Sequence, residues 1–470
     1  MRGLTSTLIL VVVLAGLGAY IYFVDSKKPA KSAATEGEPA KEKLFDKVAT
    51  DKINEIRVTY QGESTLLRKD ASGWKLVEPS QVDADATEAI GLAQNITSLE
   101  SVRPVDDNPS DLAQFGLDKP QILVEFKGEG GVAGSFKLGN KNPTQSEMYA
   151  MKGGEKRVVL VSSFQESNFN RTAFNLRDKK ILKFDRDKAD SLALAKGTSA
   201  IEMARSGSDW KVTGPVPSRS DYSAIEGFLT RLSQANMSKL VEENPKDLAK
   251  YGLDKPTVTV TIGAGSAKTG LQVGKTDGDQ MYARDASRPI VFTLDTTLKD
   301  DLNKNFDDFR KKELFDFRPF YTAKLRIVRD TKAFDFEKVP AAKPSDQETW
   351  KVTPAGAPSF TADATAMDDL LNKLPNVKAE SFIDPKSTKT GLDKPVLVVS
   401  ASYDEGKFER VRFGQVGDNY YAVRDGETGG VKVDSSSMKN VLQALDLAVT
   451  PKAPTPAPAN TTPATVGAKK

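Results

Sequence analysis

The sequence predicts an α+β protein: three tandem repeats of a mostly antiparallel sheet with packed helices, preceded by one transmembrane helix. Three observations support this prediction. The pentapeptide Gly-Leu-Asp-Lys-Pro begins at Gly116, Gly252 and Gly391, at spacings of 136 and 139 residues. Each copy follows one of the three tryptophans of the chain by 41 or 42 residues. A long uncharged stretch begins at Gly3. Repetition at a fixed period indicates one structural unit used several times.

The tryptophans give the repeat its phase. Trp74, Trp210 and Trp350 are each followed by lysine, and chance would rarely place every tryptophan of a chain at one repeat position. A chain of 470 residues is also too long for one ordinary core and suggests about three domains. We therefore predict repeat units at residues 51–186, 187–320 and 321–450.

Each unit is expected to begin with strands and continue into a helix. Alternating apolar and polar residues, as in Ile53–Tyr60, indicate half-buried strands. An aspartate then stands before apolar residues that recur at intervals of three and four, which is typical of a capped amphipathic helix. In the first unit Glu88 would complete a capping box. The capping residues are Asp85, Asp221 and Asp363.

A short helical turn is predicted next in each unit. Its N-cap and first residue would be Asn108-Pro109, Asn244-Pro245 and Asp384-Pro385. The glycine of the pentapeptide would close this turn in a left-handed conformation, and a strand would follow the proline. Later strands carry a glycine and then a Tyr-Ala pair. Closing helices are expected at residues 164–174, 297–309 and 436–447.

Basic segments link the units. They lie at residues 176–180 and 309–313, and we interpret them as solvated hinges, with contact to anionic lipid or an acidic partner as the alternative.

The two ends of the chain are predicted to lie outside the folded units. Residues 3–24 carry no charge, and at about 1.5 Å per residue they would span a bilayer core of roughly 30 Å. We expect residues 1–24 to anchor the chain in a bacterial inner membrane, with the large domain periplasmic. A cleavable signal peptide, with small residues at 15–19, is the alternative. Residues 25–50 resemble a flexible linker, and the Pro/Ala/Thr-rich residues 451–470 a disordered tail.

The composition excludes several kinds of chemistry. The chain contains no histidine and no cysteine, so thiolate nucleophiles, disulfides, imidazole catalysis and His/Cys zinc sites are ruled out. Lys and Arg total 67 against 64 Asp and Glu, and this near balance gives no reason to expect a nucleic-acid partner. Glycine-rich stretches lack the P-loop ending. We predict no catalytic residues, no cofactor and no metal.

The repeated pentapeptide, the upstream Trp-Lys strand, the glycine before a Tyr-Ala strand and the N-terminal span resemble the bacterial Domain of Unknown Function 4340 family. The resemblance covers nearly all of residues 51–447. It implies a single-span envelope protein associated with ABC-type transport components of the kind linked to gliding motility. It implies no activity and no catalytic residues.

Repeated positions supply the candidate interaction residues. We interpret the Asp-Lys pairs of the pentapeptide as tight turns in which Asp caps and Lys is solvated, with a repeated docking surface as the alternative. The tryptophans are interpreted as core rather than ligand platforms, and the tyrosines as packing rather than a shared groove. The candidates are Trp74, Trp210, Trp350, Asp118, Lys119, Asp254, Lys255, Asp393, Lys394, Tyr149, Tyr282 and Tyr421.

These features favour a non-enzymatic interaction or scaffold subunit, since enzymes seldom need three equivalent sites in line. The resemblance implies a membrane protein complex with ABC-type permease and ATPase subunits as its partner. One alternative is a module that binds a cell-wall or lipid component between units. A further alternative is an envelope hydrolase, which would require one unit to carry polar groups that the others lack.

Overall fold

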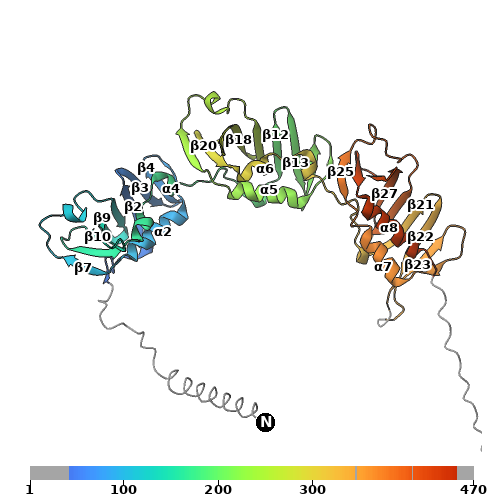
Figure 1. Ribbon diagram of the computed structural model, residues 1–470, viewed down its shortest axis with the longest axis horizontal. Helices are drawn as coiled ribbons and strands as arrows, with labels where there is room; N and C mark the ends of the chain where they lie inside the picture. Colours follow the sequence, from blue (N-terminus) through green and yellow to red (C-terminus); the bar gives the residue numbers. More distant parts are fainter. Residues whose placement is uncertain (1–41, 344–346, 405, 452–470) are drawn as a thin grey trace, which may run out of the picture. The chain divides into compact units, whose positions relative to one another are not determined.

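The protein is represented by a computed structural model that describes residues 42–343, 347–404 and 406–451. The chain divides into two compact units, one extending to Lys179 and the other beginning at Lys180. Together they contain three nine-stranded sheets, one in the first unit and two in the second (Figure 1). The predicted span at residues 3–24 lies outside the described residues. Among the helices that are described, none combines the length and apolar character needed to cross a bilayer.

The first sheet is antiparallel throughout, and its central strands, β2 (Ile53–Tyr60) and β8 (Ile122–Gly128), are far apart in sequence. Helix α2 (Ala86–Thr97) connects its two halves, and α3 (Gln165–Phe169) and α4 (Ala173–Leu176) follow its last strand. The order across the sheet is β5 (Val82–Asp83), β4 (Gly73–Glu78), β3 (Glu63–Asp70), β2 (Ile53–Tyr60), β8 (Ile122–Gly128), β9 (Ala133–Lys141), β10 (Glu147–Lys152), β11 (Val158–Ser162) and β7 (Arg103–Asp106).

The second sheet has the same strand order. It is β15 (Ser218–Arg219), β14 (Asp209–Gly214), β13 (Ser199–Ser206), β12 (Ser191–Lys196), β17 (Val258–Ala264), β18 (Ala267–Asp277), β19 (Gln280–Asp285), β20 (Ile290–Asp295) and β16 (Lys239–Glu243). Helix α5 (Tyr222–Gln234) runs along one side of it, and the short α6 (Lys299–Leu302) follows β20 (Figure 1).

The third sheet repeats the order once more. It is β24 (Phe360–Thr361), β23 (Thr349–Pro354), β22 (Lys332–Val339), β21 (Thr322–Arg329), β26 (Leu397–Tyr403), β27 (Lys407–Val416), β28 (Asn419–Arg424), β29 (Gly430–Val433) and β25 (Ala379–Ile383). Its helices are α7 (Ala364–Lys373) and α8 (Ser435–Ala448). The prediction of α+β repeats with mostly antiparallel sheets is therefore confirmed.

The core of each repeat lies between the helices and one face of its sheet. In the third repeat the apolar faces of α7 and α8 share one buried cluster with alternate residues of the strands. In the first repeat α2 contributes Leu92 and Ile96 to a cluster that also holds Ile56 and Trp74. Alternation with period two on the strands and three to four on the helices places these residues inward, as the sequence pattern requires.

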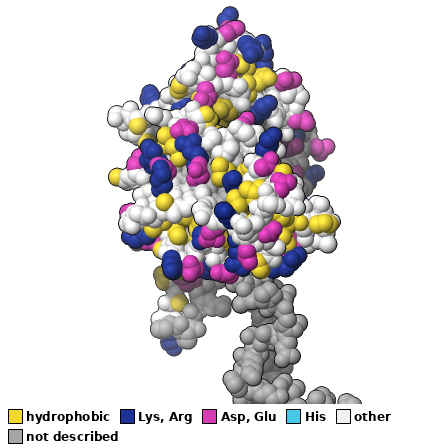
Figure 2. Space-filling model, turned by 90° about the vertical axis from the view of Figure 1, so that its left-hand side faces the viewer, with side chains coloured by type: hydrophobic (Ala, Val, Ile, Leu, Met, Phe, Trp, Pro, Cys, Tyr) yellow, Lys and Arg dark blue, Asp and Glu magenta, His cyan; other side chains and the backbone are white. Residues whose placement is uncertain are grey.

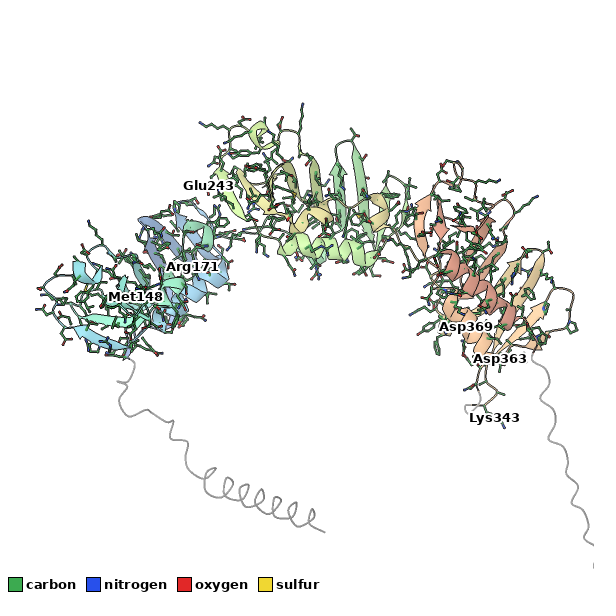
Figure 3. The ribbon with its side chains drawn as sticks, viewed as in Figure 1. Met148, Arg171, Glu243, Lys343, Asp363 and Asp369 are labelled. Carbon is green, nitrogen blue, oxygen red and sulfur yellow. The ribbon has the colours of Figure 1, made fainter. Side chains whose placement is uncertain are left out.

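The predicted helix caps are present. Asp85 accepts hydrogen bonds from the amides of Thr87 (2.9 Å) and Glu88 (3.2 Å), and Asp221 and Asp363 cap α5 and α7 in the same way. Figure 3 labels Asp363 at the start of α7. The predicted capping box is wrong, because the Glu88 carboxylate instead accepts from Nε of Arg171 at 3.1 Å.

The glycines of the pentapeptide adopt the predicted left-handed conformation, with φ of 67°, 68° and 70° at Gly116, Gly252 and Gly391. The preceding turn is shorter than predicted. It is a 3-10 turn at Ala113–Phe115 and at Ala249–Tyr251, and no such helix forms before Gly391. Asn108 and Asn244 are therefore not its N-caps. Asp111 and Asp247, three residues farther along, accept hydrogen bonds from the amides of Ala113 (2.8 Å) and Ala249 (2.9 Å), so only one helical turn remains.

A second glycine in each repeat lies against the first. A Cβ atom added to Gly139, Gly274 or Gly414 would approach the backbone oxygen of the residue before the pentapeptide glycine to 2.2, 2.2 or 2.3 Å. Two backbone segments thus touch where a side chain would otherwise lie. The glycine that precedes the Tyr-Ala strand is required by this close approach.

The closing helices differ from the prediction. Only the third, α8, is continuous, while the first is split into α3 and α4 and the second into short turns and α6. After each break, a new helical turn begins with a side-chain cap. Thr172 and Asn175 form a capping box, and so do Asn305 and Asp308. These polar residues satisfy backbone groups that a longer helix would have paired internally.

The linker predicted at residues 25–50 is wrong for its last part. Residues 42–50 are described, and Leu44 and Phe45 are buried in the core of the first unit. The Phe45 ring lies 5.0 Å from that of Phe126 in an edge-to-face arrangement. This segment has the average composition of a linker, but one buried aromatic side chain holds it against the folded unit. Residues 25–41 and 452–470 lie outside the described residues.

Candidate functional site

The Asp-Lys pairs of the pentapeptides are exposed in all three repeats. Within the described residues, none of the six side chains takes part in an ion pair. The turn itself is held by backbone contacts, for example from the amide of Lys394 to the carbonyl oxygen of Gly391 at 3.2 Å. Each pair therefore presents one carboxylate and one ammonium group to solvent. The residues are Asp118, Lys119, Asp254, Lys255, Asp393 and Lys394.

The candidate aromatic residues contribute mainly to packing. Trp74, Trp210 and Trp350 are buried on the inner side of their sheets. The tyrosines are half-buried: the Tyr149 ring lies 4.9 Å from Phe115, and Tyr282 lies 5.1 Å from Tyr251. Tyr421 is also half-buried. These tyrosines pack beside the pentapeptide turn in the first two repeats.

The interpretation of the basic links as solvated hinges is wrong for their two arginines. Arg177 is buried and its backbone bridges to Ala84 in the first unit. In the second unit the Arg310 guanidinium lies 3.7 Å from the centre of the Phe382 ring, and its backbone bridges to Ser220. Arginine is well suited to this role because its planar group stacks on aromatic rings while remaining charged.

Charged side chains join the second sheet to the third within the second unit. We call this group the junction cluster; it comprises Arg219, Lys311, Asp316, Glu409, Arg424 and Glu427. Arg219, from the edge strand β15, contacts Asp316 at 3.0 Å and also pairs with Glu427. Arg424 contacts Glu409 at 2.8 Å and Asp316 at 2.9 Å. Three positive and three negative groups compensate one another.

Glu409 is the most deeply placed member of the junction cluster, with 4% of its surface exposed. Its carboxylate accepts hydrogen bonds from the backbone amides of Asp316 (3.0 Å) and Phe317 (2.9 Å). A buried carboxylate needs such partners, because an uncompensated charge in the interior is costly. The cluster is therefore structural: its groups are committed to one another and to the backbone.

The junction cluster should make the second unit sensitive to acid. Burial by itself raises the pKa of Asp316, but the hydrogen bond from Lys311 and the charges of Arg219 and Arg424 outweigh burial and hold this pKa below its usual value. Stability from a carboxylate with a lowered pKa is present above its unfolded pKa of about 4 and is lost as pH falls through the folded value.

We therefore expect the urea midpoint of the second unit to fall more steeply between pH 5 and pH 3 in the wild type than in Asp316→Asn. Hydrogen exchange in urea, resolved by peptide, would measure the midpoint of the second unit within the full chain. Asp335→Asn is the matched control, since Asp335 pairs with Arg326 on the exposed surface. An equal pH dependence in the wild type and Asp316→Asn would contradict the expectation.

A pocket of about 490 Å³ lies in the third repeat, and sequence reasoning missed it. Its size is within the usual range of ligand pockets. We call it the Trp350 pocket, lined by Pro319, Phe320, Lys338, Gln347, Glu348, Thr349, Trp350, Ala362, Ala364, Met367, Asp368 and Leu371. Helix α7 contributes residues at intervals of three and four, so one face of this helix borders the pocket. Figure 3 shows α7 with Asp363 and Asp369 labelled.

The Trp350 pocket combines an apolar floor with a charged rim. Met367 and Leu371 are buried beneath it, whereas Phe320 is 76% exposed. The Lys338 ammonium lies 5.5 Å from the Phe320 ring centre and forms an ion pair with Glu348 at 3.1 Å. Aromatic side chains around an open space supply contact area at low entropic cost.

The described residues show no arrangement suited to metal binding. Their three buried carboxylates, Asp285, Asp301 and Glu409, each form an ion pair with at least one basic side chain. On the face seen in Figure 2, basic and acidic side chains alternate without a large area of one sign.

The three repeats match a known protein family. The family described as "Domain of unknown function (DUF4340)" matches this chain at residues 74–221 and 210–395. These two segments cover parts of all three repeats. The chain belongs to this family. No curated protein matches the DUF4340 chain.

Solved structures offer only a weak similarity to this DUF4340 protein. A DNA polymerase sliding clamp from Pseudomonas aeruginosa with ligand is 9% identical, with 82% of this chain and 92% of that chain covered and a TM-score of 0.15. The same clamp bound to griselimycin is 10% identical, with 81% and 90% covered and a TM-score of 0.15. At these scores the similarity supports no conclusion about function.

Proposed function

We propose that this DUF4340 protein is a non-enzymatic interaction subunit, anchored in the bacterial inner membrane by residues 3–24, with its three repeats outside the cytoplasm. The proposed partner is a membrane complex with ABC-type permease and ATPase subunits. The uncharged N-terminal stretch supports the anchor, and the family resemblance motivates the choice of partner.

One observation carries the proposal: buried carboxylates form ion pairs, whereas the exposed charges of the pentapeptide do not. The buried carboxylates are committed to ion pairs, as in the junction cluster. By contrast, the Asp-Lys pairs of the pentapeptide are exposed three times over without an ion pair among the described residues. Exposed charges of fixed geometry suit electrostatic recognition of a partner, where they raise the rate and specificity of association.

A quantitative pull-down tests the function. The tagged full-length chain would be purified from its native membranes in mild detergent, and copurifying proteins would be measured by mass spectrometry. We expect permease and ATPase subunits in a constant ratio to the bait. A variant with asparagine and glutamine at all six Asp-Lys positions should recover them at least tenfold less well.

The matched control neutralises another exposed pair, Arg326 and Asp335, which lie 2.7 Å apart on the third sheet. This control should recover the partners as the wild type does. A wild-type chain that is recovered alone, or only with cell-wall fragments, would contradict the proposed function. Equal recovery by the six-position variant would agree with the proposed partner but would show that the pentapeptide turns do not contact it.

A further inference from the structure

The third repeat differs from the other two at the turn that precedes its first long strand. This turn is a 3-10 turn in all repeats, at Thr50–Lys52, Arg186–Lys188 and Pro319–Tyr321. Its last two residues are Asp-Lys in the first and second repeats but Phe320-Tyr321 in the third. The two aromatic residues are 76% and 50% exposed. Apolar rings left in water forgo the stabilisation that burial would give, and such patches mark interaction surfaces.

The second repeat closes the space above its tryptophan. Glu226 of α5 accepts a hydrogen bond from Nε1 of Trp210 at 2.8 Å and forms an ion pair with Arg205 at 2.6 Å. The Arg205 guanidinium lies 5.0 Å from the centre of the Trp210 rings. This ion pair covers the indole and leaves its polar atom satisfied.

The corresponding pair does not close the third repeat. Lys338 stands opposite Trp350 in the strand register, as Arg205 stands opposite Trp210. Asp368 follows its helix cap by five residues, as Glu226 does in the second repeat. The Lys338 ammonium also lies over the Trp350 rings, 5.9 Å from their centre, but its ion pair is with Glu348 at 3.1 Å. Within the described part of the chain, Asp368 is exposed and makes no ion pair. The third repeat therefore lacks the ion pair from strand to helix that the second repeat has, and the Trp350 pocket is open on the side of α7.

We propose that the Trp350 pocket binds a segment of a partner protein that carries a large apolar side chain next to a lysine or arginine. This inference rests on the proposed function and names the surface through which the third repeat would act. The apolar side chain would lie between Phe320, Trp350 and Met367. The neighbouring cation would pair with Asp368.

Charge complementarity supports the choice of a basic residue in the partner. The rim carries two carboxylates, Glu348 and Asp368, and one ammonium group, Lys338, whose charge Glu348 already neutralises. Among the described residues of the rim, one unpaired negative charge, that of Asp368, therefore remains beside an apolar floor. Interfaces place most of their binding energy in a few large side chains that fill such pockets, and a polar rim excludes water around them.

The lining also suits a peptide side chain. Methionine is flexible and polarizable, so Met367 can adapt to the shape of an inserted group. Ala362 and Ala364 leave space at the edge of the pocket. Phe320 provides a rigid aromatic wall that is already exposed, so no buried ring must leave the core for binding to occur.

A displayed library of random dodecapeptides, selected against the full-length chain in detergent, tests the inference. We expect the enriched peptides to share an aliphatic or aromatic residue within two positions of Lys or Arg. Their dissociation constants should rise at least tenfold in the double variant Phe320→Asp, Tyr321→Lys, and also in Asp368→Lys. The double variant restores the Asp-Lys pair found at this turn in the other repeats, so the fold should accept it.

Phe408→Ser is the matched control, because Phe408 is an exposed aromatic residue of the third repeat that does not line the pocket. It should leave peptide affinity unchanged. Failure to enrich any peptide, or enriched peptides that bind the double variant equally well, would overturn the inference. Binding of peptide-free cell-wall glycan strands in place of peptides would overturn it too and would assign the pocket to a glycan.

The pull-down separates this inference from the proposed function. If the double variant still recovers the transport subunits as the wild type does, the pocket is not their contact and the inference fails, while the proposed function stands. If the wild type recovers no partner but binds the selected peptides through the pocket, the transport function fails and the peptide site remains.

Discussion

Replacing Arg424 with methionine is expected to lower the free energy of unfolding of the second unit by about 3–5 kcal/mol. Arg424 contacts both Asp316 and Glu409 in the junction cluster. Methionine would fill part of the space but would leave the buried Glu409 carboxylate without its cation. Removing one partner of a buried ion pair is far more costly than the net contribution of the pair itself.

Urea denaturation of the full chain, followed by peptide-resolved hydrogen exchange, would measure this loss separately in each unit. Arg326→Met is the control, because Arg326 pairs with Asp335 on the surface and such pairs contribute about 0–1 kcal/mol. The first unit should be unaffected by either change. A loss of stability no larger in Arg424→Met than in Arg326→Met would show that the cluster does not need its arginine.

The second large effect is expected from Gly274→Ala. The new methyl group would lie 2.2 Å from the carbonyl oxygen of Tyr251 and 2.9 Å from the carbonyl carbon of Gly252. Both are backbone atoms, so no side chain can rotate away and the strand or the pentapeptide turn must shift. Overpacking of this kind costs about 1–3 kcal/mol and sometimes more, and we expect the upper end of that range.

Gly270→Ala provides a control within the same strand, β18. Its methyl group would lie 3.5 Å from the carbonyl oxygen of Val260, an ordinary contact, and the stability change should stay within about 1 kcal/mol. The difference between the two variants would be measured as a shift in the urea midpoint of the second unit. If Gly274→Ala were as stable as Gly270→Ala, the backbone contact would not be the reason for this glycine.

The sequence alone determined the features that depend on local chemistry. The aspartate caps at the start of α2, α5 and α7 followed from a carboxylate placed before an amphipathic pattern, because a capping side chain needs only the amides of the next turn. The left-handed glycines followed from the end of a helical turn, where only glycine adopts this backbone without cost. Repetition of these signals with the tryptophans was enough to predict three α+β units.

Only the tertiary structure decided how residues distant in sequence meet. The junction cluster joins residues from position 219 to position 427, and no local pattern indicates that Arg219 reaches Asp316. The Trp350 pocket depends on which partner Lys338 takes, and this depends on where Glu348 and Asp368 lie in space. The glycine before the Tyr-Ala strand could be read from the sequence, but its reason is a contact with a distant backbone. Local propensities act over a few residues, whereas packing and charge compensation depend on how the whole repeat folds.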